Sequence, residues 1–327
     1  MRALVANGHG GAEVLELRAD HPDPVPQPHD LLIEVHACAL NPVDTKIRMG
    51  ALGEREAPFV LGFDVSGVVR ALGSDATGFD VGDEVYASPS LIRDGACADL
   101  VCVDARLAAR KPRRIDHVHA AALPLVTLTA WEALFDRCRL GTDEVVLIHA
   151  GAGGVGHVAL QLAKQRGARV LTTAGRPETQ ALCREFGADV VIDYRESDFV
   201  AAVMEETQDR GCAVVFDTVG GDVFDRSLDC VAVNGRMATI VFNESTIITP
   251  KLFAKSATLH FEFMGVPGIH GVGRDRHAEI LRLAAELADM ETLRPHVGRV
   301  ISLDEVAAAH ADLEAGRSIG KTVVQLR

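Results

Sequence analysis

The chain has 327 residues, a length typical of two domains. It carries 46 acidic and 33 basic residues, and its net charge of −13 disfavours a protein that tracks the phosphates of a nucleic acid. Apolar residues make up 48% and charged residues 24% of the chain, which excludes a wholly disordered protein.

Neither a targeting signal nor a membrane span is predicted. The first residues hold no continuous apolar segment, so we expect no secretory signal. The longest apolar stretch, residues 120–131, is interrupted by Pro124 and is far short of the ~20 residues that span a bilayer. The seven cysteines are scattered without a C-x-x-C motif, which is typical of free thiols. We therefore expect a cytoplasmic protein with no membrane partner.

The predicted elements change in character along the chain. Residues 1–122 hold short β-rich segments separated by Gly, Pro and Asp, which indicates an antiparallel barrel or sandwich. Strands then alternate with amphipathic helices, which predicts an α/β domain with a parallel, doubly wound sheet. Two helices and a last strand follow, and we expect this strand to return to the β-rich domain. The strands expected in the α/β domain are 144–149, 169–173, 189–194, 212–217, 235–242 and 258–264.

A glycine-rich loop is the sharpest local motif. Gly151, Gly153 and Gly156 form G-x-G-x-x-G directly after a predicted strand and at the start of an amphipathic helix. Glycines here permit a tight turn and a close approach of the backbone to a pyrophosphate, which the N-terminus of the helix also attracts. The alternative is an ordinary turn. In this strand–loop–helix context the motif predicts dinucleotide binding.

The end of the next strand indicates which dinucleotide binds. An acid about 20 residues after the motif would bind the ribose hydroxyls of NAD, but residues 172–176 are Thr-Thr-Ala-Gly-Arg. Arg176 suits a 2′-phosphate instead, so we predict NADPH. The alternative is that Arg176 is a solvated residue beside Pro177.

Several motifs in order resemble one family. They are ALNPVDTKIRMG (39–50), GFDVSGVV (62–69), VGDEVYA (81–87), LPLVTLTAW (123–131), AGAGGVG (150–156) and GRSIGKTVV (316–324). Together they resemble the zinc-independent, zeta-crystallin-like quinone oxidoreductase branch of the medium-chain dehydrogenases/reductases, over essentially the whole chain. The resemblance implies a GroES-like β-barrel domain made of residues 1–122 and 265–327, with a Rossmann dinucleotide-binding domain, residues 123–264, inserted into it.

The resemblance also bears on zinc. Zinc-dependent relatives hold a catalytic metal through a Cys and a His, and here Asn41 and Phe63 stand at those two positions. A phenyl ring cannot bind zinc, and an amide is a poor ligand. The four cysteines of the relatives' structural zinc site are also missing. We therefore predict neither a catalytic nor a structural zinc ion.

Without a Lewis acid the hydride acceptor must already be electrophilic, which favours a quinone or an activated enone. The resemblance implies that Asn41 lies beside the nicotinamide ribose and that Asp44 borders the substrate cleft, and we predict both as catalytic residues. We predict Lys46 as a third, a donor to a developing oxyanion. For Asn41 and Asp44 the alternative is a plain turn, and for Lys46 a solvated surface lysine or a partner of Asp44. Two other functions stay open: an enoyl or enone reductase without quinone activity, and a non-catalytic NADPH-binding structural or sensor protein.

The predicted cofactor site combines the glycine-rich loop and the segment after the next strand with positions that the resemblance implies. Val219, Val241 and Phe242 have ordinary core packing as their alternative. The resemblance also implies a homodimer, joined through the apolar segment 257–265. The full set of cofactor residues is Asn41, Thr129, Trp131, Gly151, Ala152, Gly153, Gly154, Val155, Gly156, Thr173, Ala174, Gly175, Arg176, Tyr194, Val219, Val241, Phe242 and Lys321.

Overall fold

The chain forms two compact units in the computed structural model, which describes residues 1–242, 245 and 248–327. The β-rich unit contains Met1–Leu125 and Gly265–Arg327, and the α/β unit contains Val126–Met264. No helix in the described part of the chain is both long and apolar enough to cross a membrane.

The β-rich unit is built on a seven-stranded sheet with the order β15-β16-β3-β5-β6-β8, in which β7 also pairs with β3. A smaller sheet has the order β2-β1-β4. The strands are β1 (Ala3–Ala6), β2 (Leu15–Arg18), β3 (Asp30–Ala39), β4 (Phe59–Val60), β5 (Val65–Leu72), β6 (Glu84–Ala87), β7 (Leu100–Asp104), β8 (Ala108–Arg110), β15 (Val297–Ile301) and β16 (Lys321–Gln325).

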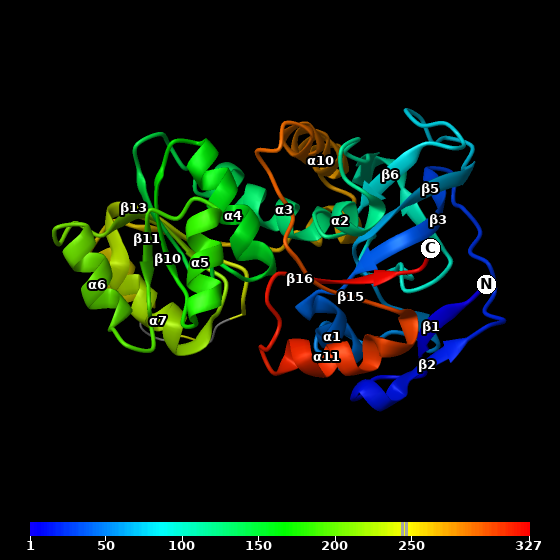
Figure 1. Ribbon diagram of the computed structural model, residues 1–327, viewed down its shortest axis with the longest axis horizontal. Helices are drawn as coiled ribbons and strands as arrows, with labels where there is room; N and C mark the ends of the chain where they lie inside the picture. Colours follow the sequence, from blue (N-terminus) through cyan, green and yellow to red (C-terminus); the bar gives the residue numbers. More distant parts are fainter. Residues whose placement is uncertain (243–244, 246–247) are drawn as a thin grey trace. The chain divides into compact units, whose positions relative to one another are not determined.

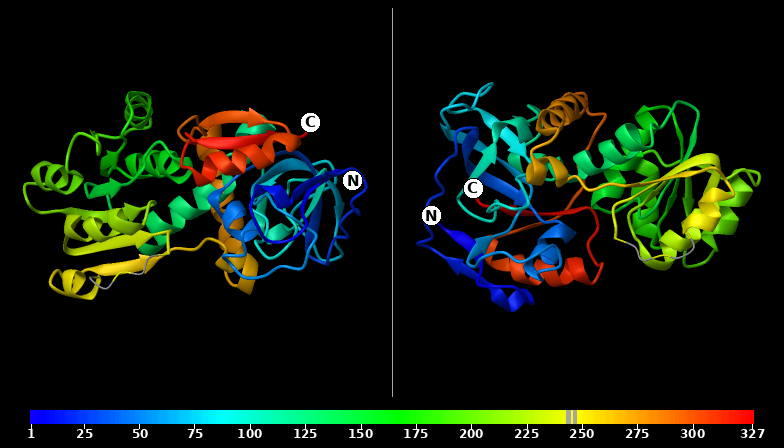
Figure 2. Two further views of the ribbon diagram at one scale, coloured as in Figure 1. Left: turned by 90° about the horizontal axis from the view of Figure 1, so that it is seen from below. Right: turned by 180° about the vertical axis from the view of Figure 1, so that it is seen from behind.

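Segments from both ends of the chain contribute helices to this unit. Figures 1 and 2 show α11 beside α1, although the two are far apart in the sequence. The last strand, β16, pairs antiparallel with β3 and parallel with β15. The α-helices are α1 (Pro42–Arg48), α2 (His117–Ala121), α9 (Val266–His270), α10 (Arg274–Asp289) and α11 (Val306–Glu314), and the 3-10 helices are η1 (Ala12–Val14), η2 (Ala105–Leu107) and η4 (Leu303–Glu305).

The α/β unit contains a six-stranded sheet in which every neighbouring pair is parallel, with the order β11-β10-β9-β12-β13-β14. This is the doubly wound order, and it confirms the predicted Rossmann sheet. The strands are β9 (Val145–Ile148), β10 (Arg169–Thr173), β11 (Val190–Ile192), β12 (Cys212–Asp217), β13 (Val231–Thr239) and β14 (Thr258–Phe261).

Helices cover both faces of this sheet. Figure 1 shows α4 and α5 on one side and α6 and α7 on the other. Apolar side chains of α6 and α7, such as Phe199 and Phe224, pack with Leu147 and Val215 of the sheet. The helices of this part of the chain are α3 (Pro124–Trp131), whose first two residues belong to the β-rich unit, the π-helix η3 (Glu132–Arg137), α4 (Gly154–Gln165), α5 (Pro177–Glu185), α6 (Phe199–Glu206), α7 (Gly221–Cys230) and α8 (Ile248–Phe253).

One strand starts earlier than its sequence indicates. The sequence predicts a strand over 235–242, whereas β13 runs from Val231 to Thr239. Asn234 takes a φ of 59° within the strand, and the pairing of β12 with β13 shifts its register there. The segment before Gly235 is therefore an irregular part of the same strand.

Candidate functional site

The glycine-rich loop connects β9 to α4, and two of its glycines have no room for a side chain. A Cβ on Gly151 would lie 2.3 Å from Thr172 Oγ1, and a Cβ on Gly156 would lie 2.2 Å from the carbonyl oxygen of Ala150. The Ala150 carbonyl also accepts the N–H of Gly153 at 2.8 Å, which closes the turn. At Gly151 and Gly156 the loop therefore presents backbone atoms and no side chain.

The start of α4 faces the same loop. Because α4 begins at Gly154, the N–H groups of its first turn have no acceptor within the helix and lie at its positive end. Ala152 and Gly153 precede the helix, and Val155 follows its first residue. A loop of bare backbone beside a helix N-terminus fits a pyrophosphate, so the predicted residues of this segment fit a dinucleotide.

Two arginines, Arg176 and Arg195, lie near the segment that follows β10. Thr173 and Ala174 are buried there, and Arg176 is half-exposed with its Nε 3.5 Å from Glu178 Oε1. A Cβ on Gly175 would lie 2.8 Å from both the Tyr194 ring and Arg195 Nε. Arg195 was missed in the sequence, although it directly follows the predicted Tyr194.

Other predicted cofactor residues of this unit have different surroundings. Thr129 and Trp131 lie on α3, where Thr129 is buried and the Trp131 ring meets Phe135 edge-on at 5.1 Å between centroids. Val219 and Phe242 are 45% and 83% exposed, so core packing is excluded for both. Val241 is partly buried.

A buried polar cluster forms at the start of α1 in the β-rich unit. It consists of Asn41, Asp44, Asp64 and Lys321, whose exposures are all 2% or less. The chain brings them together from α1, the segment before β5 and the first residue of β16. The cluster unites predicted Asn41, Asp44 and Lys321 with Asp64, which sequence reasoning missed. Its signal was an acid inside the apolar segment 62–69.

The carboxylate of Asp44 accepts hydrogen bonds from two backbone N–H groups. One of its carboxylate oxygens accepts the N–H of Asn41 at 2.7 Å, and the other accepts the N–H of Gly62 at 2.8 Å. Burial raises the pKa of Asp44 to about 7, and the two N–H donors and the Lys321 ammonium partly oppose this rise. Both oxygens are engaged, so Asp44 fixes the start of α1 against the segment before β5.

Lys321 supplies the positive charge of the cluster. Its ammonium donates to Asp64 Oδ2 at 2.9 Å, to the Leu40 carbonyl at 3.0 Å, and to Asn41 Oδ1. The Asn41 amide donates in turn to Asp64 Oδ2 at 2.8 Å. Burial raises the pKa of Asp64, and Lys321 and Asn41 counteract this effect.

Lys46 takes no part in the hydrogen bonds given above for this cluster. Its side chain is half-buried on α1, and no ion pair joins it to Asp44 among the described residues. Both oxygens of Asp44 are already bonded to backbone, so the alternative that Lys46 is a partner of Asp44 has no support in the structure.

This donor set does not fit a zinc ion. Phe63 is buried beside Asp64, and the oxygens of Asn41 and Asp64 both accept from the Lys321 ammonium. A cation would have to displace the ammonium from these oxygens, and neither thiolate nor imidazole is present to bind it. In the described part of the chain no three His, Cys, Asp or Glu residues form a metal-binding group.

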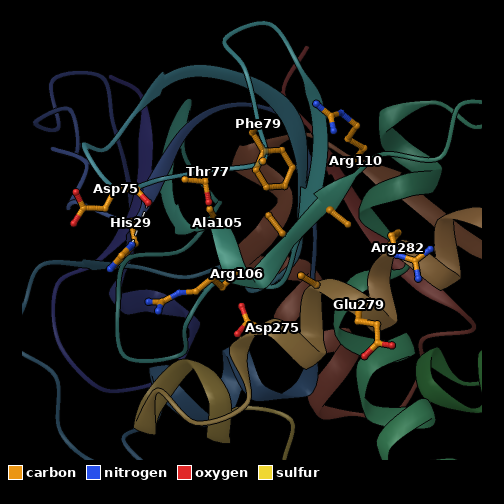
Figure 3. A pocket seen from close by; sticks show the side chains of 14 residues that line it. His29, Asp75, Thr77, Phe79, Ala105, Arg106, Arg110, Asp275, Glu279 and Arg282 are labelled. Atoms are coloured by element: carbon orange, nitrogen blue, oxygen red, sulfur yellow. Dashed lines mark hydrogen bonds between the residues drawn. The ribbon is translucent and has the colours of Figure 1, made fainter.

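A surface pocket of about 600 Å³ lies elsewhere on the β-rich unit (Figure 3). Phe79 and Arg110 line it together with Arg106 and Asp275. The two arginines are already paired, Arg106 with Asp104 and Arg110 with Asp83. None of the predicted site residues lines this pocket, and we assign no substrate to it.

Comparison with known proteins agrees with this geometry. Residues 27–113 match the model of the alcohol dehydrogenase GroES-like domain, and residues 186–324 match that of the zinc-binding dehydrogenases. Human quinone oxidoreductase is 30% identical over 331 residues, which cover 100% of this chain and 98% of the human protein. The chain belongs to the quinone oxidoreductase family of the medium-chain dehydrogenases/reductases.

Two solved structures extend the similarity. The quinone oxidoreductase of Coxiella burnetii has a TM-score of 0.87 and 33% identity, covering 100% of this chain and 99% of its own. A mycobacterial protein in complex with NADPH has a TM-score of 0.89 and 33% identity, covering 99% and 100%. The predicted family and fold class are confirmed: the chain is an oxidoreductase with a GroES-like domain and a Rossmann NAD(P)-binding domain.

Proposed function

We propose that the protein is a zinc-independent, NADPH-dependent reductase that transfers a hydride to a quinone or an activated enone. The observation that carries this proposal is the buried Lys321 ammonium, which donates to Asn41 and Asp64 in the segments where zinc-dependent relatives hold their metal. A reductase without a Lewis acid needs an acceptor that is already electrophilic. Quinones and conjugated enones meet this requirement.

The choice of NADPH rests on charge at the end of β10. Residues 172–176 carry no acid that would repel a 2′-phosphate, and Arg176 and Arg195 both lie next to Gly175. The NADPH complex of the mycobacterial relative supports the same choice. When bound, the reduced nicotinamide supplies the hydride. The glycine-rich loop and the N-terminus of α4 hold the pyrophosphate.

The β-rich unit contributes positioning and a proton or hydrogen-bond donor. Asp44 positions α1 through two backbone N–H groups, so the location of Lys46 on that helix is fixed. Lys46 is the donor to the oxygen on which negative charge develops in the acceptor. Asn41 is held by Lys321 and Asp64 and is the residue of this cluster that contacts the nicotinamide ribose.

The protein acts as a homodimer in the cytoplasm. The strand β14 lies at the edge of the parallel sheet and exposes Phe261, while Phe263 follows it with 43% exposure. An exposed apolar edge strand is an aggregation hazard unless another chain covers it. All seven cysteines are free and buried, which suits a reducing compartment.

The decay of nicotinamide absorbance tests the function. The purified protein is mixed with NADPH or NADH and with a quinone, an enone or an aldehyde, with and without a chelator. Fast, chelator-resistant oxidation of NADPH by the quinone is the expected result. Turnover with the enone alone would identify an enone reductase, and tight binding without any turnover would indicate a structural or sensor protein. Preference for NADH, or loss of activity with a removed metal, would contradict the proposal.

A further inference from the structure

His149 occupies a buried position directly beneath the glycine-rich loop. It follows β9, is 1% exposed, and precedes Ala150, the first residue of the loop. Its backbone is held on both sides, because its N–H donates to the Phe216 carbonyl at 3.1 Å and its carbonyl accepts from Thr218 Oγ1 at 2.9 Å. The imidazole ring therefore has a fixed place from which both nitrogens meet partners.

The hydroxyl on one side of the ring determines its tautomer. Ser227 Oγ lies 2.8 Å from His149 Nε2 and donates its single proton to the Val223 carbonyl at 2.6 Å. Since that proton is used, Nε2 must carry a hydrogen and donate to Ser227. Burial lowers the pKa of His149 to about 4, so the ring is neutral and Nδ1 is an acceptor.

The other side of the ring completes a directed chain of hydrogen bonds. Thr173 Oγ1 lies 3.2 Å from His149 Nδ1 and accepts the N–H of Ala150 at 3.1 Å. The Thr173 hydroxyl proton is thus donated to Nδ1. The chain runs from Ala150 N–H through Thr173, His149 and Ser227 to the Val223 carbonyl, and every donor in it has an acceptor.

Ala150, at the start of this chain, has an unusual backbone conformation. Its φ is 50°, in the left-handed region that an alanine enters only at an energetic cost. This conformation directs the Ala150 carbonyl toward Gly153 N and into the space that a Cβ of Gly156 would fill. The shape of the glycine-rich loop thus depends on Ala150 staying left-handed.

We propose that His149 is a positioning residue of the dinucleotide site. It orients the Thr173 hydroxyl to accept Ala150 N–H, and this hydrogen bond holds Ala150 left-handed and the loop in the shape that receives a pyrophosphate. The inference rests on the proposed function for its ligand, but the hydrogen-bond chain itself can be tested without any ligand.

The variant His149→Phe removes both ring nitrogens and keeps an aromatic ring. Because the loop then loses a stabilising hydrogen bond, the Kd for NADPH is expected to rise about fivefold. Adding Ala150→Gly, which adopts the left-handed conformation without the alanine's cost, is expected to recover at least half of this loss. A purely structural role for His149 gives no such rescue. Ser227→Ala removes the far acceptor and serves as the milder variant if His149→Phe fails to fold.

Thr207→Val is the matched control. Thr207 is a buried threonine of the same unit whose hydroxyl donates to the Val203 carbonyl at 2.8 Å and accepts Gly211 N–H at 3.0 Å. The Thr207→Val variant is expected to lower the melting temperature without changing the Kd for NADPH. If His149→Phe behaves in the same way, or if Ala150→Gly recovers nothing, the proposal is wrong.

Backbone hydrogen exchange separates this proposal from the proposed function. In the protein without cofactor, we expect the N–H of Ala150 to exchange slowly, and we expect His149→Phe to accelerate this exchange at least fivefold while the exchange of Gly211 N–H is unaffected. If the wild-type protein binds neither NADPH nor NADH, the proposed function fails, and the exchange rate of Ala150 still decides whether His149 holds the loop. Equal exchange rates in wild type and variant would overturn the proposal.

Discussion

Lys321 Nζ lies 2.9 Å from Asp64 Oδ2, and both side chains are removed from water. The two residues are 257 positions apart in the sequence. A buried pair of this kind is costly to break, because the remaining charge keeps its desolvation penalty without its partner.

Lys321→Met leaves Asp64 buried and unpaired, so it is expected to lower the free energy of unfolding by about 3–5 kcal/mol. The double variant Lys321→Met/Asp64→Asn removes the orphaned charge, and Asn41 can then turn its amide oxygen toward residue 64. Urea unfolding of both variants should show the double variant recovering more than half of the loss. A double variant as unstable as Lys321→Met would show that the ion pair is not the cause.

Asp44 gives a pH dependence with a definite sign. Its pKa is about 7 in the folded protein, so between roughly pH 4 and pH 7 the folded state holds a proton that the unfolded chain has released. The free energy of unfolding therefore falls as the pH rises through this interval. Asp44→Asn is expected to remove this contribution, at a pH-independent cost of about 1–3 kcal/mol for the N–H group that it leaves without an acceptor.

Urea unfolding at several pH values measures the difference between wild type and Asp44→Asn. Asp20→Asn, which removes an exposed carboxylate, is the control. A constant difference from pH 4 to pH 8 would contradict the raised pKa of Asp44.

Arg176 and Arg195 are expected to determine the preference for NADPH. Each alanine variant should raise the Kd for NADPH about fivefold and leave that for NADH almost unchanged, because only the 2′-phosphate loses a charge-assisted partner. Arg176→Glu should have a larger effect through repulsion. Fluorescence titration measures both constants, and Arg184→Ala, which removes an exposed charge on the same helix, is the control. NADPH affinity that survives Arg176→Glu would refute the assignment.

Lys46→Met is expected to reduce kcat at least tenfold with the Kd for NADPH unchanged, since the lysine acts on the acceptor and not on the cofactor. Steady-state rates with a saturating quinone and a separate NADPH titration measure the two effects. Lys251→Met removes a lysine that pairs with Asp229 in the other unit and should leave both values as in the wild type. A wild-type rate in Lys46→Met would leave Lys46 as a solvated surface residue.

The edge strand β14 predicts the oligomeric state. Light scattering of the wild type should give twice the 34.9 kDa of the chain. Phe261→Glu places a charge on the exposed edge and is expected to give a monomer, whereas Phe253→Glu, at an even more exposed phenylalanine of α8, should remain dimeric. A wild type that is monomeric at assay concentration would contradict the homodimer.

The sequence by itself determined the features that depend on neighbouring residues. The period of the apolar residues predicted the strands and helices of the α/β unit, and the spacing of Gly151, Gly153 and Gly156 located the dinucleotide loop, because both patterns act over a few residues. Ordered motifs along the chain identified the family. Strand ends were less well determined: the strand predicted over 235–242 spans Val231–Thr239, and its pairing with β12 shifts register near Asn234.

Only the tertiary structure decided which polar side chains meet. Lys321 lies 280 positions from Asn41, and His149 lies 78 positions from Ser227, so no spacing in the sequence links them. Burial makes these contacts energetically important, since a charge or a hydrogen-bond donor that is removed from water is costly unless it has a partner within the protein. The same long-range pairing buries the Lys321 ammonium against Asn41 and Asp64, and it joins His149 through the Thr173 hydroxyl to a loop that the sequence had already identified.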